Sequence, residues 1–342
     1  MIIVVAKSIP MRIITLIIFT GLLLAIITTP ATVHAASGAI SCEFSGGNSF
    51  SFGSLSIGST ATTTASAKYT CHLQDYTPGV NHYANICLSS EDAPPFKMHS
   101  NGDSEGNVYT LLFRVYNLSD PAQELQQSDN LMQQTIMLNT NNTTVGGTFN
   151  LKGIVPAGQN DIPAYAYYNY SMTIRIRWNT ETSTDALASC QSGQAQNSAT
   201  NGGNTQSSAS VSDSCAIQSV SNLDFGLLEA STLRLQTTKA SAQIQARCPL
   251  GTAFSLGIDN GSHGNGDSRQ MCNGNNRCLT YTLWQDSSAS MPWGNTANVD
   301  RVDVSSASGS AQSFVVYGEV PSGQAVNGDG IFSDDVVITL TY

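Results

Sequence analysis

Charged side chains are scarce in this sequence, and basic ones are the scarcest. Only 11% of the residues are charged, with 14 Lys and Arg against 24 Asp and Glu. Nucleic acids and anionic membranes attract proteins through clusters of Lys and Arg, and no such cluster occurs here. The composition therefore argues against both kinds of partner, and we expect no nucleic acid among the ligands.

The sequence also lacks the common motifs of catalysis and metal binding. It has no G-x-S-x-G, H-E-x-x-H or phosphate loop, and its histidines are scattered without metal-ligand spacing. Residues 259–268 and 327–330 are similar to calcium loops in composition, but Asn-Gly and Asp-Gly pairs are typical of hairpin turns. We expect no enzyme activity, no metal and no cofactor.

Only one long hydrophobic run is present, at residues 13–27. It follows Lys7 and Arg12 and precedes Val33 and Ala35, which is the order of a secretory signal peptide. The run is too short for a membrane-spanning helix. We expect cleavage after Ala35, so that residues 1–35 are a signal peptide and the remainder is exported.

Sustained helical periodicity is missing beyond residue 35, apart from a weak pattern at 121–133. Short alternating runs separated by Gly, Pro, Asn and Asp take its place, as at 242–246 and 314–317. Regular short strands with turn residues between them predict an all-β fold of the β-sandwich class.

An internal repeat is the most informative pattern that is present. Cys42 is followed by Phe52-Gly53 at the spacing at which Cys215 is followed by Phe225-Gly226. Three further landmarks recur in the same order: YTL at 109–111 and 281–283, GIVPAGQ at 153–159 and GEVPSGQ at 318–324, and an alternating strand at 170–178 and 334–342. The repeat predicts two copies of one sandwich.

The segment between the copies is polar and rich in Ser, Gly and Asn. Such a composition cannot bury a core, so we expect residues 191–214 to be a flexible linker. The domains are then predicted at 36–190 and 215–342.

Eight cysteines in an exported protein indicate disulfides. The repeat predicts two equivalent bridges, Cys42–Cys71 and Cys215–Cys248. The other four cysteines would close a small loop and, by exclusion, one long-range bridge: Cys272–Cys278 and Cys87–Cys190.

The repeated landmarks together resemble the spore coat protein U domain family, which includes pilins of archaic, Csu-type chaperone–usher pili. A two-domain member is similar to the tip adhesin of such a pilus. The resemblance implies two immunoglobulin-like β-sandwiches, an N-terminal adhesin domain and a C-terminal pilin domain that lacks one strand.

The same resemblance implies the partners and the location. A periplasmic chaperone lends the missing strand during transport, and an outer-membrane usher directs assembly. An adjacent pilin subunit then donates its N-terminal extension as the strand. The protein would be exported through the periplasm to the cell surface, at the pilus tip.

The last strand would line the groove of the incomplete sandwich. Val336, Ile338, Leu340 and Tyr342 fall on one face, as the groove for a chaperone strand or a donor strand requires. An ordinary core strand alternates in the same way, so the residues alone leave both interpretations open. Only residues 36–41 precede Cys42 after the predicted cleavage, and a donor strand needs roughly ten residues at ~3.3 Å each. We therefore expect a subunit that accepts a strand and donates none.

Three stretches of the first copy are longer or more apolar than their counterparts in the second. We expect them to protrude as stiff loops that bind apolar surfaces, because proline lowers the entropy lost on contact. The candidate residues are Pro78, Val80, Tyr83, Pro94, Pro95, Phe96, Met98, Leu118, Leu125, Ile162, Pro163, Tyr165, Tyr167 and Tyr168. The last five enter the final strand of their domain, which should place them at the end far from the linker.

Alternatives remain for these residues. Each could fold back into the core of the first domain, and a tyrosine cluster could equally stack on sugar rings, which keeps a glycan ligand open. Two functions therefore compete. One is a pilus tip adhesin that attaches to abiotic or host surfaces and promotes biofilm formation. The other is a freestanding secreted binding protein, lectin-like or a coat component, with two complete sandwiches.

Overall fold

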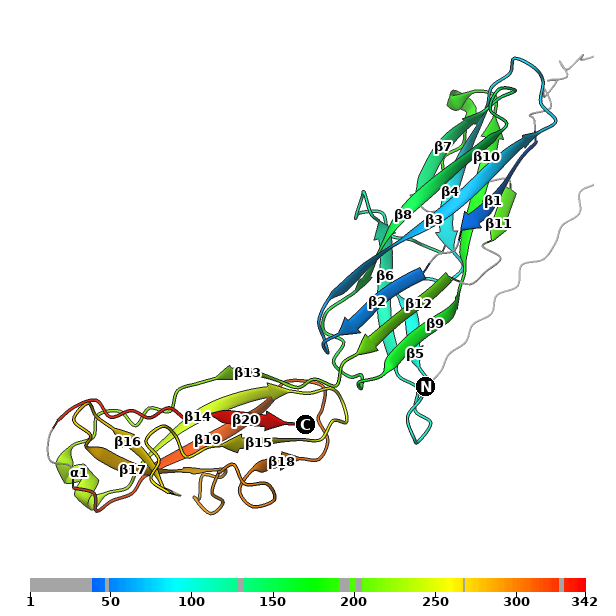
Figure 1. The fold of residues 1–342 in the computed structure, drawn as a ribbon. Coiled ribbons are helices and arrows are strands. Elements are labelled where there is room, and N and C mark those ends of the chain that lie inside the picture. The colour runs from blue at the N-terminus through cyan, green and yellow to red at the C-terminus, as the bar shows by residue number, and fades with distance from the viewer. Residues whose placement is uncertain are drawn as a thin grey trace, which may run out of the picture. The chain divides into compact units, whose positions relative to one another are not determined.

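The computed structural model describes residues 39–46, 49–127, 132–190, 197–200, 205–266, 268–325 and 329–342. The expected signal peptide and parts of the expected linker lie outside these residues. Strands supply nearly all the regular structure (Figure 1), which confirms the all-β prediction. The described helices are the short η1 (Thr184–Ala186) and α1 (Ala230–Leu235), and none of them is long and apolar enough to cross a membrane.

The N-terminal sandwich is built from two sheets. One follows the strand order β1-β3-β8-β6-β5-β9-β12-β2, and the other follows β11-β10-β4-β7. The strand bounds are β1 (Ala39–Gly46), β2 (Ser49–Leu55), β3 (Ala61–Gln74), β4 (His82–Ser90), β5 (Phe96–Ser100), β6 (Thr110–Asn117), β7 (Gln133–Leu138), β8 (Thr144–Val155), β9 (Ala166–Met172), β10 (Ile174–Glu181), β11 (Asn197–Thr200) and β12 (Thr205–Val211).

The C-terminal sandwich also has two sheets. Their strand orders are β13-β14-β19-β17-β16 and β18-β15-β20. The strand bounds are β13 (Ala216–Val220), β14 (Thr238–Arg247), β15 (Phe254–Ile258), β16 (Arg269–Cys272), β17 (Cys278–Trp284), β18 (Val302–Val304), β19 (Gln312–Val320) and β20 (Ile338–Thr341).

Each sandwich has a hydrophobic core of its own. Phe50, Phe113 and Leu88 are among the fully buried residues of the first core, and Trp293 and Leu256 are among those of the second. Alternate residues of the strands supply these side chains, because successive side chains of a strand point to opposite faces. The apolar alternation read from the sequence therefore marks the core of both sandwiches.

Strand β12 lies inside the segment expected to be a flexible linker. It pairs in parallel with β2 and antiparallel with β9, and its inward side chains are buried. The linker prediction is therefore wrong for residues 205–211. The inward residues Thr205, Ser207 and Ala209 are small or polar, so the segment shows no apolar alternation, yet pairing on both edges satisfies its backbone.

The four expected disulfides are confirmed. Cys42–Cys71 and Cys215–Cys248 each join the first strand of a sandwich to its neighbour, as the repeat predicted. The other two pairings, which rested on loop size and exclusion, are Cys272–Cys278 and Cys87–Cys190.

Candidate functional site

The C-terminal strand β20 lies at the edge of its sheet. It pairs along β15, with Ile338 opposite Ile258 and Leu340 opposite Leu256. Within the described part of the chain, no strand pairs with its other edge. A bare edge presents unpaired N–H and C=O groups, so it is a template for a further strand.

The inward side chains of this strand and of the residues on either side of it are only partly covered. Val336, Ile338 and Leu340 pack against the second core but stay half-buried, and Tyr342 is 58% exposed. Side chains of this kind are normally buried when a strand lies inside a complete sandwich. Their partial exposure favours the interpretation as a groove over that as an ordinary core strand.

Residues 222–228 hold the place in the C-terminal sandwich that β2 holds in the N-terminal one. They lie so close to β19 that a Cβ added at Gly318 would meet the side chains of Leu223 and Phe225. Glycine marks such positions because any side chain would block the close approach. Residues 222–228 form no strand and pair with none in the described part of the chain.

The N-terminal sandwich repeats this contact, with one difference. A Cβ added at Gly153 of β8 would meet Phe50 and Phe52 of β2, and the sequence repeat aligns Gly153 with Gly318 and Phe52 with Phe225. Here, however, β12 pairs with β2 on one side and with β9 on the other. In the C-terminal sandwich, residues 222–228 lie on one side of this position and the chain that leads into β20 lies on the other. Among the described residues, no strand lies between them.

A polar cluster holds the chain in place immediately before β20. The carboxylate of Asp334, only 2% exposed, lies 3.0 Å from Nδ1 of His263 and accepts a hydrogen bond of 2.7 Å from the Tyr281 hydroxyl. Burial, and then this bond, raises the pKa of Tyr281, which keeps its hydroxyl a neutral donor. The backbone N–H of Val337 donates to the Asp259 carboxylate at 2.8 Å. The open edge therefore belongs to an anchored strand.

The tyrosine-rich stretch of the N-terminal sandwich does not protrude as a loop. Ile162 and Pro163 are buried, and the buried Tyr167 donates its hydroxyl to the carbonyl of Pro163 at 2.9 Å. Of the candidate residues in this stretch, Tyr165 is exposed and Tyr168 is half-buried on β9. The prediction of exposed loop residues is wrong for the three buried ones, because Ile162 and Tyr167 belong to the first core and Pro163 is buried and bonded to Tyr167.

The position expected for this stretch is also wrong. Val211, the last residue of β12, donates its backbone N–H to the carbonyl of Tyr165 at 2.9 Å. The tyrosines therefore lie beside the point where the chain leaves the sandwich. The expectation assumed that the chain leaves after the last strand of the repeat, whereas β12 runs back along β9 and moves the exit to the opposite end.

The remaining loop candidates divide between core and surface. Phe96 and Met98 point inward from β5, whose burial alternates, and Leu125 is fully buried. The prediction is wrong for these three residues, because alternation along a strand turns every second side chain to the core. The others are exposed or half-buried: Pro78, Val80, Tyr83, Pro94, Pro95 and Leu118.

The end of the N-terminal sandwich away from Val211 is formed by the turns at 75–81 and 139–143 (Figure 1). These turns lie together, since the backbone N–H of Leu73 bonds to the carbonyl of Thr143 at 2.8 Å. The 14 residues of β3 separate them from the loops beside the chain exit.

Two exposed side chains at this far end were not among the residues predicted from the sequence. Tyr76 lies in the turn, and Met137 is exposed on β7 directly across from Tyr83 of β4. The position of Tyr76, two residues before Pro78, could have identified it. Met137 alternates within an ordinary strand pattern, and no local pattern distinguishes it from a core residue.

A second aromatic surface lies on the outer face of β9. Tyr168 and Tyr170 stack with their ring centroids 5.6 Å apart, and Tyr170 is exposed. The alternate spacing of these two residues in the sequence could have predicted that they share a face.

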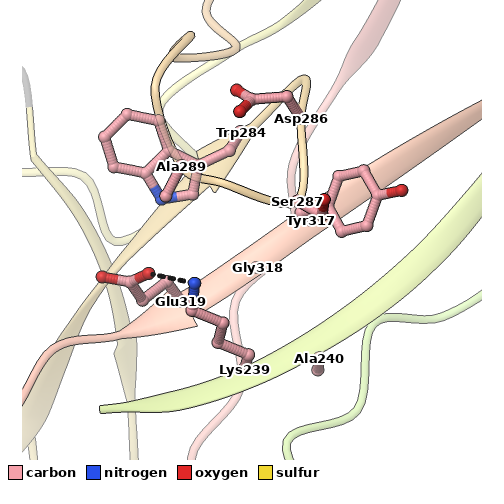
Figure 2. Close-up of a pocket in the computed structure, with 9 residues that line it drawn as sticks. All are labelled: Lys239, Ala240, Trp284, Asp286, Ser287, Ala289, Tyr317, Gly318 and Glu319. Atoms are coloured by element: carbon pink, nitrogen blue, oxygen red, sulfur yellow. Dashed lines mark ion pairs between the residues drawn. The ribbon is translucent and has the colours of Figure 1, made fainter.

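The C-terminal sandwich also carries a shallow pocket, shown in Figure 2, on the side of Trp284 and Tyr317. Lys239 and Glu319 form an ion pair of 3.5 Å at its margin. Its volume of about 20 Å³ suffices for roughly one water molecule, which is too little for a sugar ring or a peptide side chain. Across the described residues, no three His, Cys, Asp or Glu side chains gather where they could hold a metal ion.

The chain was compared with known proteins. It matches no curated protein sequence. Among solved structures, it is similar to the chaperone–tip adhesion subunit complex of archaic Csu pili from Acinetobacter baumannii, at 13% identity, 88% coverage of this chain, 100% coverage of that chain and a TM-score of 0.46. It is also similar to the CupB6 tip adhesin of Pseudomonas aeruginosa, at 9% identity, 89% and 94% coverage and a TM-score of 0.33.

The family comparison concerns the part of the chain that contains the open edge. The match begins at residue 202, within the segment that leads into β12, and extends into β20. It agrees with the expectation that the chain is not an enzyme. Residues 202–339 match the Spore Coat Protein U domain, and this match includes the C-terminal sandwich up to β20.

Proposed function

We propose that this protein is the tip adhesin of a chaperone–usher pilus and that its C-terminal sandwich is completed by a strand from another polypeptide. The carrying observation is the contrast between two aligned strands. Ile174 and Ile176 of β10 are fully buried, and β11 pairs with that strand, whereas their counterparts Ile338 and Leu340 are half-buried beside an open edge.

An added strand would satisfy the unpaired backbone of β20, and its alternate side chains would cover Val336, Ile338, Leu340 and Tyr342. Strands β11 and β12 supply the geometry. β11 is antiparallel to β10, the counterpart of β20, and β12 is antiparallel to β9 and parallel to β2, the counterpart of residues 222–228.

The partners follow from this proposal. A periplasmic chaperone fills the groove during transport, an outer-membrane usher directs assembly, and an adjacent subunit donates the final strand. The signal peptide expected at 1–35 would direct export, and the pilus tip at the cell surface would be the final location. We place the boundary between the adhesin and pilin domains at residues 212–214, after β12, since β12 belongs to the first sandwich.

The adhesive surface of the N-terminal domain lies at the end away from Val211. Tyr76 and Met137 are exposed there, and Pro78, Val80 and Tyr83 accompany them. Contact with an apolar surface would bury this area at ~25 cal/mol per Å². The proline in the turn lowers the entropy lost on contact. We favour an apolar abiotic or host surface, with biofilm formation as the consequence of many such contacts.

Expression with and without the chaperone tests the groove. Co-expression should yield a soluble one-to-one complex, and expression alone should yield aggregated or degraded protein. The double substitution Ile338→Asp/Leu340→Asp should abolish the complex, while Val315→Asp, on the outer face of β19, should preserve it. A soluble monomer made without any chaperone would instead support a freestanding secreted protein with two complete sandwiches.

Attachment assays test the adhesive end. The substitutions Tyr76→Ser and Met137→Ser should reduce attachment to polystyrene several-fold while pili still assemble. The matched change Tyr170→Ser on β9 should leave attachment unchanged. If Tyr170→Ser alone reduced binding, and only on glycan-coated surfaces, a lectin function of the outer face of β9 would replace the proposed one.

A further inference from the structure

The three most exposed large hydrophobic side chains of the described residues all belong to the C-terminal sandwich. They are Leu227, Ile331 and Leu235, exposed to 94%, 88% and 80%. Single apolar side chains on a surface are common, but several large ones at one end of a domain indicate a contact surface.

These residues, which we call the end patch, lie at the end of the sandwich that carries α1. The two leucines precede and end this helix. The backbone N–H of Gln324 bonds to a carbonyl of α1, and a Cβ at Gly330, next to the isoleucine, would lie close to Asn273 in the β16–β17 turn. Figure 1 shows α1 and the β16–β17 hairpin at this same end.

The direction of the missing strand connects the end patch to the groove. Strand β12 runs parallel to β2 in the N-terminal sandwich. Residues 222–228, the counterpart of β2, run towards α1, which begins at Ala230. A strand donated in the same direction therefore leaves the groove at the α1 end. When the donor is an N-terminal extension, the folded body of the donor subunit follows at that end.

This inference rests on the proposed function and extends it. We infer that the end patch docks against the folded body of the subunit whose extension fills the groove. The N-terminal sandwich supports this assignment. The residue after its Phe-Gly pair is Ser54, whereas Leu227 follows the pair in the C-terminal sandwich. The N-terminal sandwich receives its strand from its own chain, so no donor body arrives there and the position stays polar.

Comparison of a donor peptide with the whole donor subunit tests the end patch. The variant is Leu227→Ser/Leu235→Ser/Ile331→Ser in the full chain, prepared as the chaperone complex. The probes are a synthetic peptide with the sequence of the N-terminal extension of the shaft subunit, and the shaft subunit itself. We expect the peptide to bind the variant and the wild type within about twofold. The complex with the whole subunit should dissociate at least tenfold faster in the variant.

Val299→Ser is the matched control, because Val299 is 76% exposed in the loop before β18, and β18 lies at the sheet edge opposite β20. Equal dissociation rates of variant and wild type from the whole subunit would overturn the inference. So would an equal loss of peptide binding, since the leucines would then act on the groove itself. Failure of the wild type to bind either probe would overturn the proposed function and this inference with it.

Discussion

The two sandwiches of this protein end in strands with the same alternation of apolar residues, yet those residues differ in burial. Ile174 and Ile176 are inaccessible to solvent, and Ile338 and Leu340 are half-buried. The cores differ in the same direction. In the first core, buried apolar residues far outnumber partly buried ones. In the second core, partly buried apolar residues are almost as numerous as buried ones.

Two strands account for this difference, β11 beside β10 and β12 beside β2, and no described strand of the second sandwich takes either place. Leu223, Phe225 and Leu228 of the second sandwich are half-buried, although Phe50, Phe52 and Leu55 at the matching positions of β2 are buried. The side chains are equally apolar in both sandwiches, so composition is not the cause. The first sandwich has β12 beside β2, and nothing described in the second occupies that position.

A strand supplied within the same chain should remove the difference in burial between the two sandwiches. This is the largest effect that we expect. A flexible linker and a β-strand with Val at alternate positions, fused after Tyr342, would cover the half-buried residues of the groove. We expect the free energy of unfolding of the C-terminal sandwich to rise on the order of 5 kcal/mol, from about 1 kcal/mol per newly covered side chain. Hydrogen exchange in urea measures this sandwich separately.

The control is the same fusion with Asp in place of each inward Val. It should leave the protein dependent on its chaperone. A C-terminal sandwich that is equally protected with and without the apolar strand would show that the groove is closed by its own residues.

A matched pair of isoleucines sharpens the comparison. Ile174→Ala removes a fully buried side chain, so it should lower the free energy of unfolding of the N-terminal sandwich by ~2–5 kcal/mol. Ile338→Ala should lower that of the C-terminal sandwich by only about 1 kcal/mol, because the side chain is already half exposed to water. Urea denaturation of both variants measures the gap, and the fused strand should close it. Equal losses in the unfused protein would contradict the open groove.

The buried hydroxyls of β12 provide a smaller effect. Thr205 Oγ1 and Ser207 Oγ face the first core without a hydrogen-bond partner. Replacing both by apolar groups of similar size, as Thr205→Val/Ser207→Ala, should raise the free energy of unfolding by about 1 kcal/mol each. Thermal unfolding measures the change. The outward Ser210→Ala serves as the control, and a loss of stability in the double variant would contradict the burial described here.

The two sandwiches should differ least in the pKa values at their acidic turns. In each sandwich, hydrogen bonds within a turn lower the pKa of one aspartate. The side chain of Asn107 and further donors lower the pKa of Asp103 to about 2, and Ser288 with its neighbours lowers that of Asp286 to about 2. A lowered folded pKa favours folding above the usual value and loses this effect as the pH falls through about 2. NMR titration should give both values, with or without a bound donor strand. An ordinary pKa at either turn would contradict the turn geometry.

Much of this architecture could be predicted from the sequence, because the landmarks of the repeat are side chains that must be buried or bonded. The disulfides, the all-β fold and the alternation of Val336, Ile338 and Leu340 all follow from such residues. Strand β12 could not be predicted, since Thr205, Ser207 and Ala209 fit between two existing strands without an apolar pattern. Its place depends on tertiary pairing rather than on local preference.

The exposure of individual loop residues was equally hard to predict. Phe96, Met98 and Tyr167 stand among prolines and other apolar residues, and their neighbours in sequence are exposed or half-buried. The face towards which each one points depends on the register of its strand, and a shift of one residue exchanges the two faces. Predicting the far end of the sandwich failed for a related reason, because one unforeseen strand reverses the direction in which the chain leaves.

Strand β12 also determines where mechanical load enters the N-terminal sandwich. Only residues 212–214 separate Val211 from Cys215, so tension along the chain between the two sandwiches reaches the end of β12 almost directly. The bonds loaded first are those from Val211 to Tyr165 and from Ser212 to Leu55. The strand that closes the first core is thus also the element through which tension on the chain would reach that core.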